Sequence, residues 1–123
     1  HIYGEGDELA AAVAIVDANV GKIWQAVQHR QKTHDEDWLV VVTTDHGRDE
    51  ETGKSHGGQS LRERTTWIAT NSQRLNSNFE NLPGIVDILP SILDHLFIVP
   101  PPRIAAQLDG VSFIDRQDNE PVR

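Results

Sequence analysis

The chain has 123 residues, of which 37% are hydrophobic and 24% are charged, enough for one small core and too few for two domains. Its 19 acidic residues outnumber 11 basic ones, and the net charge of −8 argues against binding to a nucleic-acid backbone. Cysteine is absent, which excludes disulfides and thiolate metal ligands, and no apolar run reaches the roughly 20 residues of a transmembrane helix.

The first predicted element is a long amphipathic helix from about Asp7 to Gln31. Its apolar residues recur at alternating steps of four and three positions, which places them on one face of a helix. They are Leu9, Val13, Val16, Val20, Ile23 and Val27. Acidic residues at the start and basic residues at the end suit the helix dipole, and we expect the apolar face to be buried.

A strand is predicted next, over residues 38–44, because this run is mostly apolar and rich in β-branched side chains. Such a strand is typically buried on both faces, as in a parallel sheet covered by helices. A polar loop over 71–81 separates a second strand over 65–70 from a helix over 85–96, and a short strand near 108–113 follows. A helix followed by a buried strand is half of a β-α-β unit, so the predicted fold class is α/β.

Asp45 and His46 are the centre of the functional interpretation. Both follow directly after a predicted buried strand, at the edge of an α/β sheet where ligand sites gather, and Gly47 allows the backbone to turn away sharply. A carboxylate oxygen and an imidazole nitrogen are suitable ligands for zinc or manganese. Taken alone, the triplet fits equally well an Asp45 that caps the next turn beside an incidental histidine.

His56 strengthens the metal interpretation. It lies a short polar loop after His46, and Gly57 and Gly58 behind it allow the backbone to approach a ligand closely. A second histidine can bind the same ion or a neighbouring one, and two metals about 3.5–4 Å apart can hold both the attacking and the leaving oxygen of a displacement. We expect the polar residues 49–52 of the loop to face solvent.

Four short motifs occur along the chain in an order and at a spacing that make a family resemblance specific. They are His1-Ile-Tyr-Gly4, Val16-Asp-Ala-Asn-Val-Gly21, Leu39-Val-Val-Val-Thr-Thr-Asp-His-Gly47 and His56-Gly-Gly58. Together they resemble the alkaline phosphatase superfamily, and most closely its type I phosphodiesterase/nucleotide pyrophosphatase branch. Residues 85–93 and 108–112 resemble the last helix of that family and the segment after it, so the resemblance covers most of residues 1–114.

The resemblance implies a hydrolase of phosphate esters that uses two divalent metal ions, usually zinc, with manganese as the alternative. By position, Asp45 and His46 match the pair on the metal that activates the nucleophile. His56 and His1 match histidines on the second metal, which contacts the substrate. The threonine or serine nucleophile of the family and a further aspartate ligand match no residue here. No catalytic residue is therefore assigned in this chain, and we expect the chain alone to be inactive.

The resemblance also implies a place in a larger fold. The chain begins with His1 rather than methionine, and we expect it to be the C-terminal half of a helix-covered, mostly parallel sheet. Residues 1–115 are expected to belong to the catalytic domain and 116–123 to form a loose tail. An uncovered strand edge and helix face would favour self-association. The compartment stays open, although the resemblance favours an extracytoplasmic or periplasmic one.

Other functions stay open. The interval between His46 and His56 is shorter than in nucleotide pyrophosphatases and is similar to other branches, including phosphomutases and sulfatases. Sulfatases generally carry a different ligand pair around a single calcium ion, so the Asp-His pair argues against them. A non-catalytic, degenerate member of the family is the alternative from another class. In every enzymatic interpretation, the expected partner is a small phosphate-ester substrate or a close chemical relative, with no nucleic-acid polymer and no membrane segment.

Overall fold

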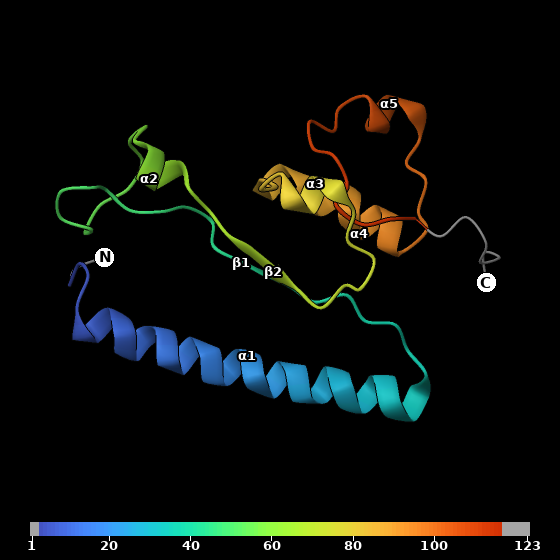
Figure 1. Ribbon diagram of the computed structural model, residues 1–123, viewed down its shortest axis with the longest axis horizontal. Coiled ribbons are helices and arrows are strands. Elements are labelled where there is room, and N and C mark those ends of the chain that lie inside the picture. The colour runs from blue at the N-terminus through green and yellow to red at the C-terminus, as the bar shows by residue number, and fades with distance from the viewer. Residues whose placement is uncertain (1–2, 117–123) are drawn as a thin grey trace. The chain divides into compact units, whose positions relative to one another are not determined.

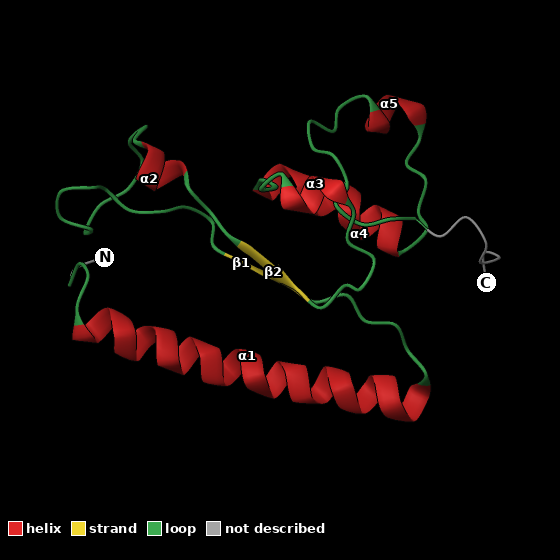
Figure 2. Ribbon diagram, viewed as in Figure 1, coloured by secondary structure: helices red, strands yellow, loops and turns green. Residues whose placement is uncertain are grey.

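The computed structural model describes residues 3–116 and combines one long helix, several short helices and a two-stranded sheet (Figures 1 and 2). These residues form two compact units. One unit comprises residues 3–38 and 46–65, and the other comprises residues 39–45 and 66–116. The mixture of helix and strand agrees with the predicted α and β content. The division into residues 1–115 and a tail stays a prediction, and residues 117–123 lie outside the described part of the chain.

Helix α1 spans Asp7–His34 and confirms the long helix predicted from the apolar periodicity. It ends where Asp35 adopts a left-handed backbone with φ of 54°. Val27 is the one buried side chain of this helix, whereas Val16 is 59% exposed and Ile23 is 61% exposed. The apolar face is thus present, but the expectation that it is buried is wrong for most of its length. Neither α1 nor any other helix of residues 3–116 is long and apolar enough to cross a membrane.

The sheet consists of β1 (Val41–Thr43) and β2 (Ile68–Thr70), which pair in antiparallel register with Val42 opposite Ala69. Both strands are shorter than predicted. The parallel arrangement expected from the sequence is not seen, because residues 3–116 contain this antiparallel pair and no parallel one. A parallel pair needs a crossover connection, usually a helix of a dozen or more residues, whereas the segment between these strands contains only the four-residue helix α2 (Leu61–Arg64).

The second unit also holds the short helices of the C-terminal half. The helix predicted over residues 85–96 is confirmed as a 3₁₀ turn, η1 (Ile85–Asp87), followed by α4 (Ile88–His95). Two further single-turn helices are α3 (Ser77–Glu80) and α5 (Pro102–Ala105). Helix α3 lies inside the stretch predicted as a loop. It forms because the side chain of Asn76 accepts a hydrogen bond from the Asn78 amide at 2.9 Å and so caps the helix start.

The core of this unit surrounds the C-terminal segment. Phe113 and Ile114 are fully buried, and the Phe113 ring meets that of Phe79 edge-on at 5.5 Å. The buried Ser91 hydroxyl accepts a hydrogen bond from the Phe113 amide at 2.9 Å and donates one to the Asp87 carbonyl at 2.7 Å. The predicted terminal strand is reduced to a single antiparallel bridge between Leu75 and Ile114. This segment therefore closes the small core rather than extending the sheet.

Truncation of the central side chain tests this core. Phe113→Ala is expected to lower the free energy of unfolding by about 3–5 kcal/mol, because the ring is completely buried. The matched control is Val111→Ala, two residues earlier at a side chain that is 60% exposed, with an expected change within about 0.5 kcal/mol. Urea unfolding followed by circular dichroism measures both. Equal effects of the two changes would contradict the placement of the core.

Candidate metal centre

The structure brings His46 and His56 together. Their imidazole rings stack with centroids 4.0 Å apart and planes inclined by 18°. Both residues belong to the same compact unit, and His46 is half-buried while His56 is exposed. The polar loop after β1 therefore returns the second histidine to the first. This agrees with the predicted association of the two residues.

The stacking decides how the two rings can bind metal. The lone pair of an imidazole nitrogen lies in the plane of its ring, and zinc binds on that line at about 2.0–2.1 Å. Ring planes inclined by only 18° at a centroid distance of 4.0 Å do not converge on one point that close to both rings. The pair therefore fits one imidazole on each of two ions about 3.5–4 Å apart better than two imidazoles on one ion.

A hydrogen bond selects the tautomer of His46. Its Nδ1 lies 2.7 Å from the carbonyl oxygen of Gly47. A carbonyl can only accept, so Nδ1 must carry the proton and donate it. In a neutral ring the lone pair then resides on Nε2. A backbone carbonyl that fixes the ring orientation from the opposite nitrogen is the usual arrangement behind a metal-binding histidine.

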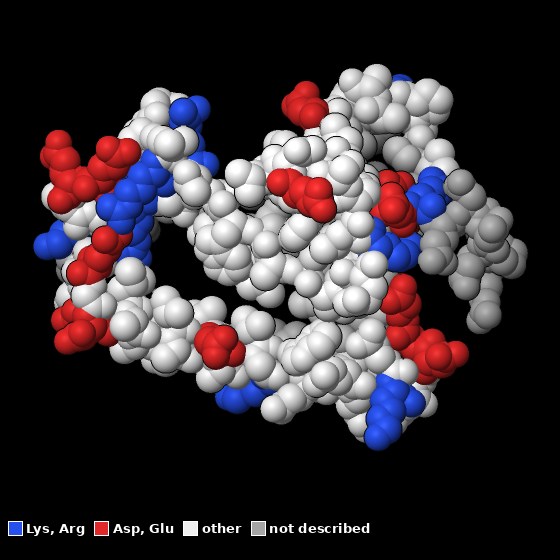
Figure 3. Space-filling model, viewed as in Figure 1, with Lys and Arg blue, Asp and Glu red and all other residues white. Residues whose placement is uncertain are grey.

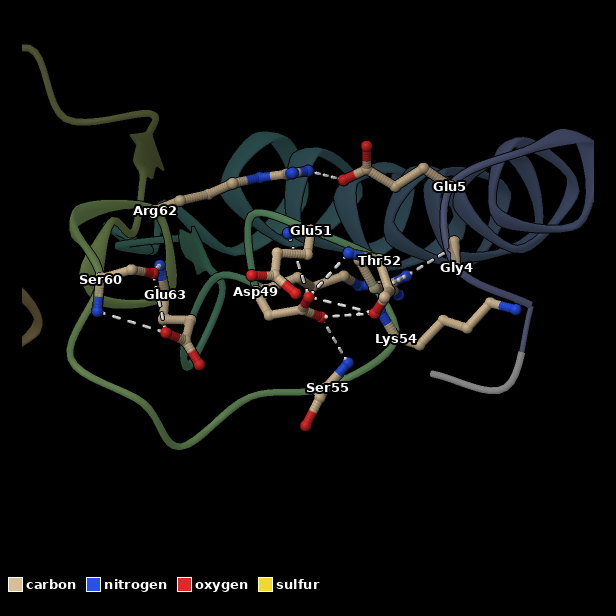
Figure 4. A network of polar contacts seen from close by, with 12 residues as sticks. Gly4, Glu5, Asp49, Glu51, Thr52, Lys54, Ser55, Ser60, Arg62 and Glu63 are labelled. Atoms are coloured by element: carbon tan, nitrogen blue, oxygen red, sulfur yellow. Dashed lines mark hydrogen bonds and ion pairs between the residues drawn. The ribbon is translucent and has the colours of Figure 1, made fainter.

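Asp49 closes the loop that joins the two histidines (Figure 4). Its amide donates to the Ser55 carbonyl at 2.9 Å, and its side chain accepts from the Ser55 amide at 2.8 Å. The same carboxylate accepts from the Thr52 amide at 2.7 Å, from the Thr52 hydroxyl at 3.0 Å and from the Glu51 amide at 3.2 Å. Asp49 lies soon after His46 and Ser55 lies directly before His56, so this pairing brings together the two segments that carry the imidazoles.

Residues 50–52 are exposed, as expected, whereas Asp49 is half-buried and its carboxylate binds backbone amides of the loop. The Thr52 amide, and next the Ser55 amide, hold the pKa of Asp49 well below its usual range, because both donate to the charged carboxylate. Sequence inspection did not single out Asp49. The signal was nevertheless present, since an aspartate in a polar loop shortly before a glycine, as Asp49 is before Gly53, favours a turn in which the side chain binds nearby backbone amides.

Helix α2 packs against the segment just after His46, which forms the first arm of the loop between the two histidines. Ser60 and Glu63 form a capping box at the start of the helix, and Glu63 also accepts from the Gly58 amide at 2.8 Å. The Ser60 hydroxyl, followed by the Gly58 amide, lowers the pKa of Glu63. The Gly47 amide donates to the Glu63 carbonyl at 2.8 Å. Glu63 therefore links the segment after His46 to the segment after His56.

The three glycines of the loop differ in what an added Cβ would meet. Gly47 does not adopt a left-handed backbone, and it is needed because a Cβ there would lie 1.9 Å from the Arg62 carbonyl oxygen. Gly57 has a φ of 99° with open space around it, so it supplies an unusual backbone conformation, and its close approach to a ligand stays a prediction. A Cβ on Gly58 would lie 2.4 Å from the Glu63 carboxylate.

Asp45 and His1 are the remaining predicted ligands. Asp45 is exposed and follows β1 closely, but it belongs to the other compact unit from its chain neighbour His46, and its role stays a prediction. His1 lies outside the described residues. Among residues 3–116, no group of three or more histidine, aspartate or glutamate side chains is arranged to hold a metal ion. The stacked pair of imidazoles is therefore the part of the predicted ligand set that the structure brings together, and the rest of that set stays a prediction.

Charge near the histidine loop is mixed in sign. Within the loop, three consecutive acidic residues beginning at Asp49 lie between Arg48 and Lys54, and Arg62 forms an ion pair with Glu5. Figure 3 shows side chains of both signs close together over this part of the unit. The acidic balance of the whole chain is therefore not concentrated as a single negative surface around the histidines.

We compared the chain with known protein families, curated proteins and solved structures. No protein-family model, no curated protein and no solved structure matches this chain. The resemblance to the alkaline phosphatase superfamily rests on the motifs in the sequence and stays a prediction.

Proposed function

We propose that this chain forms the C-terminal part of the catalytic domain of a metal-dependent hydrolase of phosphate esters, similar to the alkaline phosphatase superfamily. The observation that carries the proposal is the stacked pair of His46 and His56 in the loop that follows β1. In a protein without cysteine, imidazole and carboxylate groups are the donors for zinc or manganese, and this loop joins two such imidazoles.

Each residue has a separate task in the proposed site. The Nε2 atom of His46 would face one ion together with the Asp45 carboxylate, and His56 would face the second ion together with His1. The stacked geometry favours this division over a shared ion. When bound, two such ions lower the pKa of a hydroxyl nucleophile and stabilise charge on the phosphoryl oxygens. The Gly47 carbonyl keeps His46 in the tautomer that this task requires.

The proposal requires groups from outside these 123 residues. A threonine or serine nucleophile and further aspartate ligands must come from sequence that precedes His1. The two short strands would then belong to a larger, helix-covered and mostly parallel sheet. A degenerate, non-catalytic relative would contain the histidine pair without these upstream groups, so the coding sequence before His1 separates the two interpretations.

Removal of either histidine tests the assignment. In the protein that contains this chain and its upstream sequence, His46→Ala and His56→Ala are each expected to lower zinc affinity and turnover by about 100-fold or more, because each removes a ligand rather than a residue behind one. The matched control is His29→Ala, because His29 is exposed on α1 of the same compact unit. Metal analysis and hydrolysis of a nitrophenyl phosphodiester and a nitrophenyl phosphomonoester measure the effects.

The controls also decide between functions. A full metal complement with normal turnover in His56→Ala would contradict the ligand assignment. Absence of both metal and turnover in the unaltered protein would favour the non-catalytic alternative. Conversion of a phosphosugar into its isomer, without net hydrolysis, would favour a phosphomutase.

A further inference from the structure

The segment before α1 is fastened to the histidine loop within one compact unit. Gly4 and Gly53 are both buried, and both have left-handed backbones, with φ of 66° and 64°. A Cβ on Gly4 would lie 2.9 Å from the Thr52 carbonyl oxygen, and a Cβ on Gly53 would lie 2.8 Å from the Glu5 side chain. The two glycines thus allow the two segments to pack closely, Gly4 against the backbone of Thr52 and Gly53 against the side chain of Glu5.

Arg48 connects these two segments. One guanidinium nitrogen, Nη1, donates to the Gly4 carbonyl at 2.8 Å and to the Gly53 carbonyl at 3.2 Å. The segment before α1 is also tied to α2, through the ion pair between Glu5 and Arg62 (Figure 4). The half-buried Arg48 therefore links its own part of the loop, just after His46, both to Gly53 later in the loop and to Gly4 before α1.

We infer that Arg48 is a positioning residue for the histidine pair. It lies just after His46, and it binds Gly53 just before His56, so its guanidinium spans the two arms that carry the imidazoles. The hydrogen bond to Gly4 also ties the loop to a residue outside it. The loop as a whole is therefore restrained relative to the segment before α1. The role at the metal rests on the proposed function, whereas the effect on ring stacking does not.

The direct test uses the nuclear Overhauser effect (NOE) between the His46 and His56 ring protons in the 123-residue chain. The effect is expected in the unaltered chain, where the ring centroids are 4.0 Å apart, and is expected to be lost in Arg48→Met. The matched control is Arg64→Met, which removes an equal charge from an exposed position at the end of α2. Arg48→Lys keeps the charge and one donor group, and should restore part of the effect.

A second readout addresses the metal. With Co²⁺ alone as the probe, and in the protein that contains this chain and its upstream sequence, Arg48→Met should weaken Co²⁺ affinity by about 10-fold or more, and Arg64→Met should not change it. If the longer protein binds no Co²⁺ while the 123-residue chain shows ring contact, the proposed metal function fails, and the inference is still decided by the ring contact in Arg48→Met.

Clear outcomes overturn the inference. Undiminished ring contact in Arg48→Met would show that the guanidinium does not position the histidines. If Arg48→Met loses the helical circular-dichroism signal of α1, Arg48→Lys is compared with Arg64→Lys instead. A reduced NOE in Arg48→Lys alone supports the inference, and equal NOEs in both variants contradict it.

Discussion

Gly47→Ala is expected to displace α2 from the histidine loop and to lower the free energy of unfolding by about 3 kcal/mol. The new Cβ would lie 1.9 Å from the Arg62 carbonyl oxygen and 2.9 Å from its carbonyl carbon. These are backbone atoms, so no side-chain rotation relieves the overlap. The hydrogen bond from the Gly47 amide to the Glu63 carbonyl would also be lost. Because His46 directly precedes this position, its ring contact with His56 should be lost as well.

Gly21→Ala provides the matched control in the same compact unit. Gly21 lies inside α1, and a Cβ there meets nothing within 4 Å. Alanine is the better helix former, so this change should raise the free energy of unfolding by about 0.5–1 kcal/mol. Urea unfolding of both variants measures the contrast. If Gly47→Ala is as stable as the unaltered chain and keeps the ring contact, the packing of α2 on this arm is wrong.

Asp49→Ala is expected to open the loop and to separate the two histidines. The carboxylate accepts hydrogen bonds from Thr52 and Ser55, and no alanine contact can replace them. Trypsin should then cleave after Lys54 faster than in the unaltered chain. In the complete protein, turnover should fall by about 10–100-fold, as for other residues that support a metal ligand.

Glu50→Ala is the matched control for Asp49→Ala. Glu50 is the next residue in the chain and is exposed. Its removal takes away the same charge from the same loop, so proteolysis and turnover should stay close to those of the unaltered protein. If Glu50→Ala were the damaging change and Asp49→Ala were tolerated, the hydrogen bonds of Asp49 would not be what closes the loop.

The same carboxylate makes the loop sensitive to acid. The Thr52 and Ser55 amides lower the pKa of Asp49 in the folded chain below its unfolded value of about 3.9. Its contribution to stability is therefore complete above about pH 4 and is lost as the pH falls towards the folded pKa. A ¹³C titration of the Asp49 carboxyl measures this. A midpoint at or above the ordinary aspartate value would contradict the hydrogen bonding.

Local sequence patterns determined the elements that depend on neighbouring residues. The spacing of apolar residues in α1 predicted a helix because each step of three or four positions returns to the same face. The apolar stretch that opens with Gly84 and Ile85 similarly predicted η1 and α4. The sequence also indicated that His46 and His56 lie together, because both occupy one polar loop after a β-branched strand.

Tertiary contacts decided the features that depend on residues far apart in the chain. The antiparallel pairing of β1 and β2 follows from the path of the segment between them, and an apolar strand sequence has no direction of its own. Arg48 binds Gly4 across a separation of 44 residues, so no local pattern around either residue reveals the contact. The exposure of most of the apolar face of α1 was likewise unreadable, since periodicity shows which side chains share a face but not what covers them.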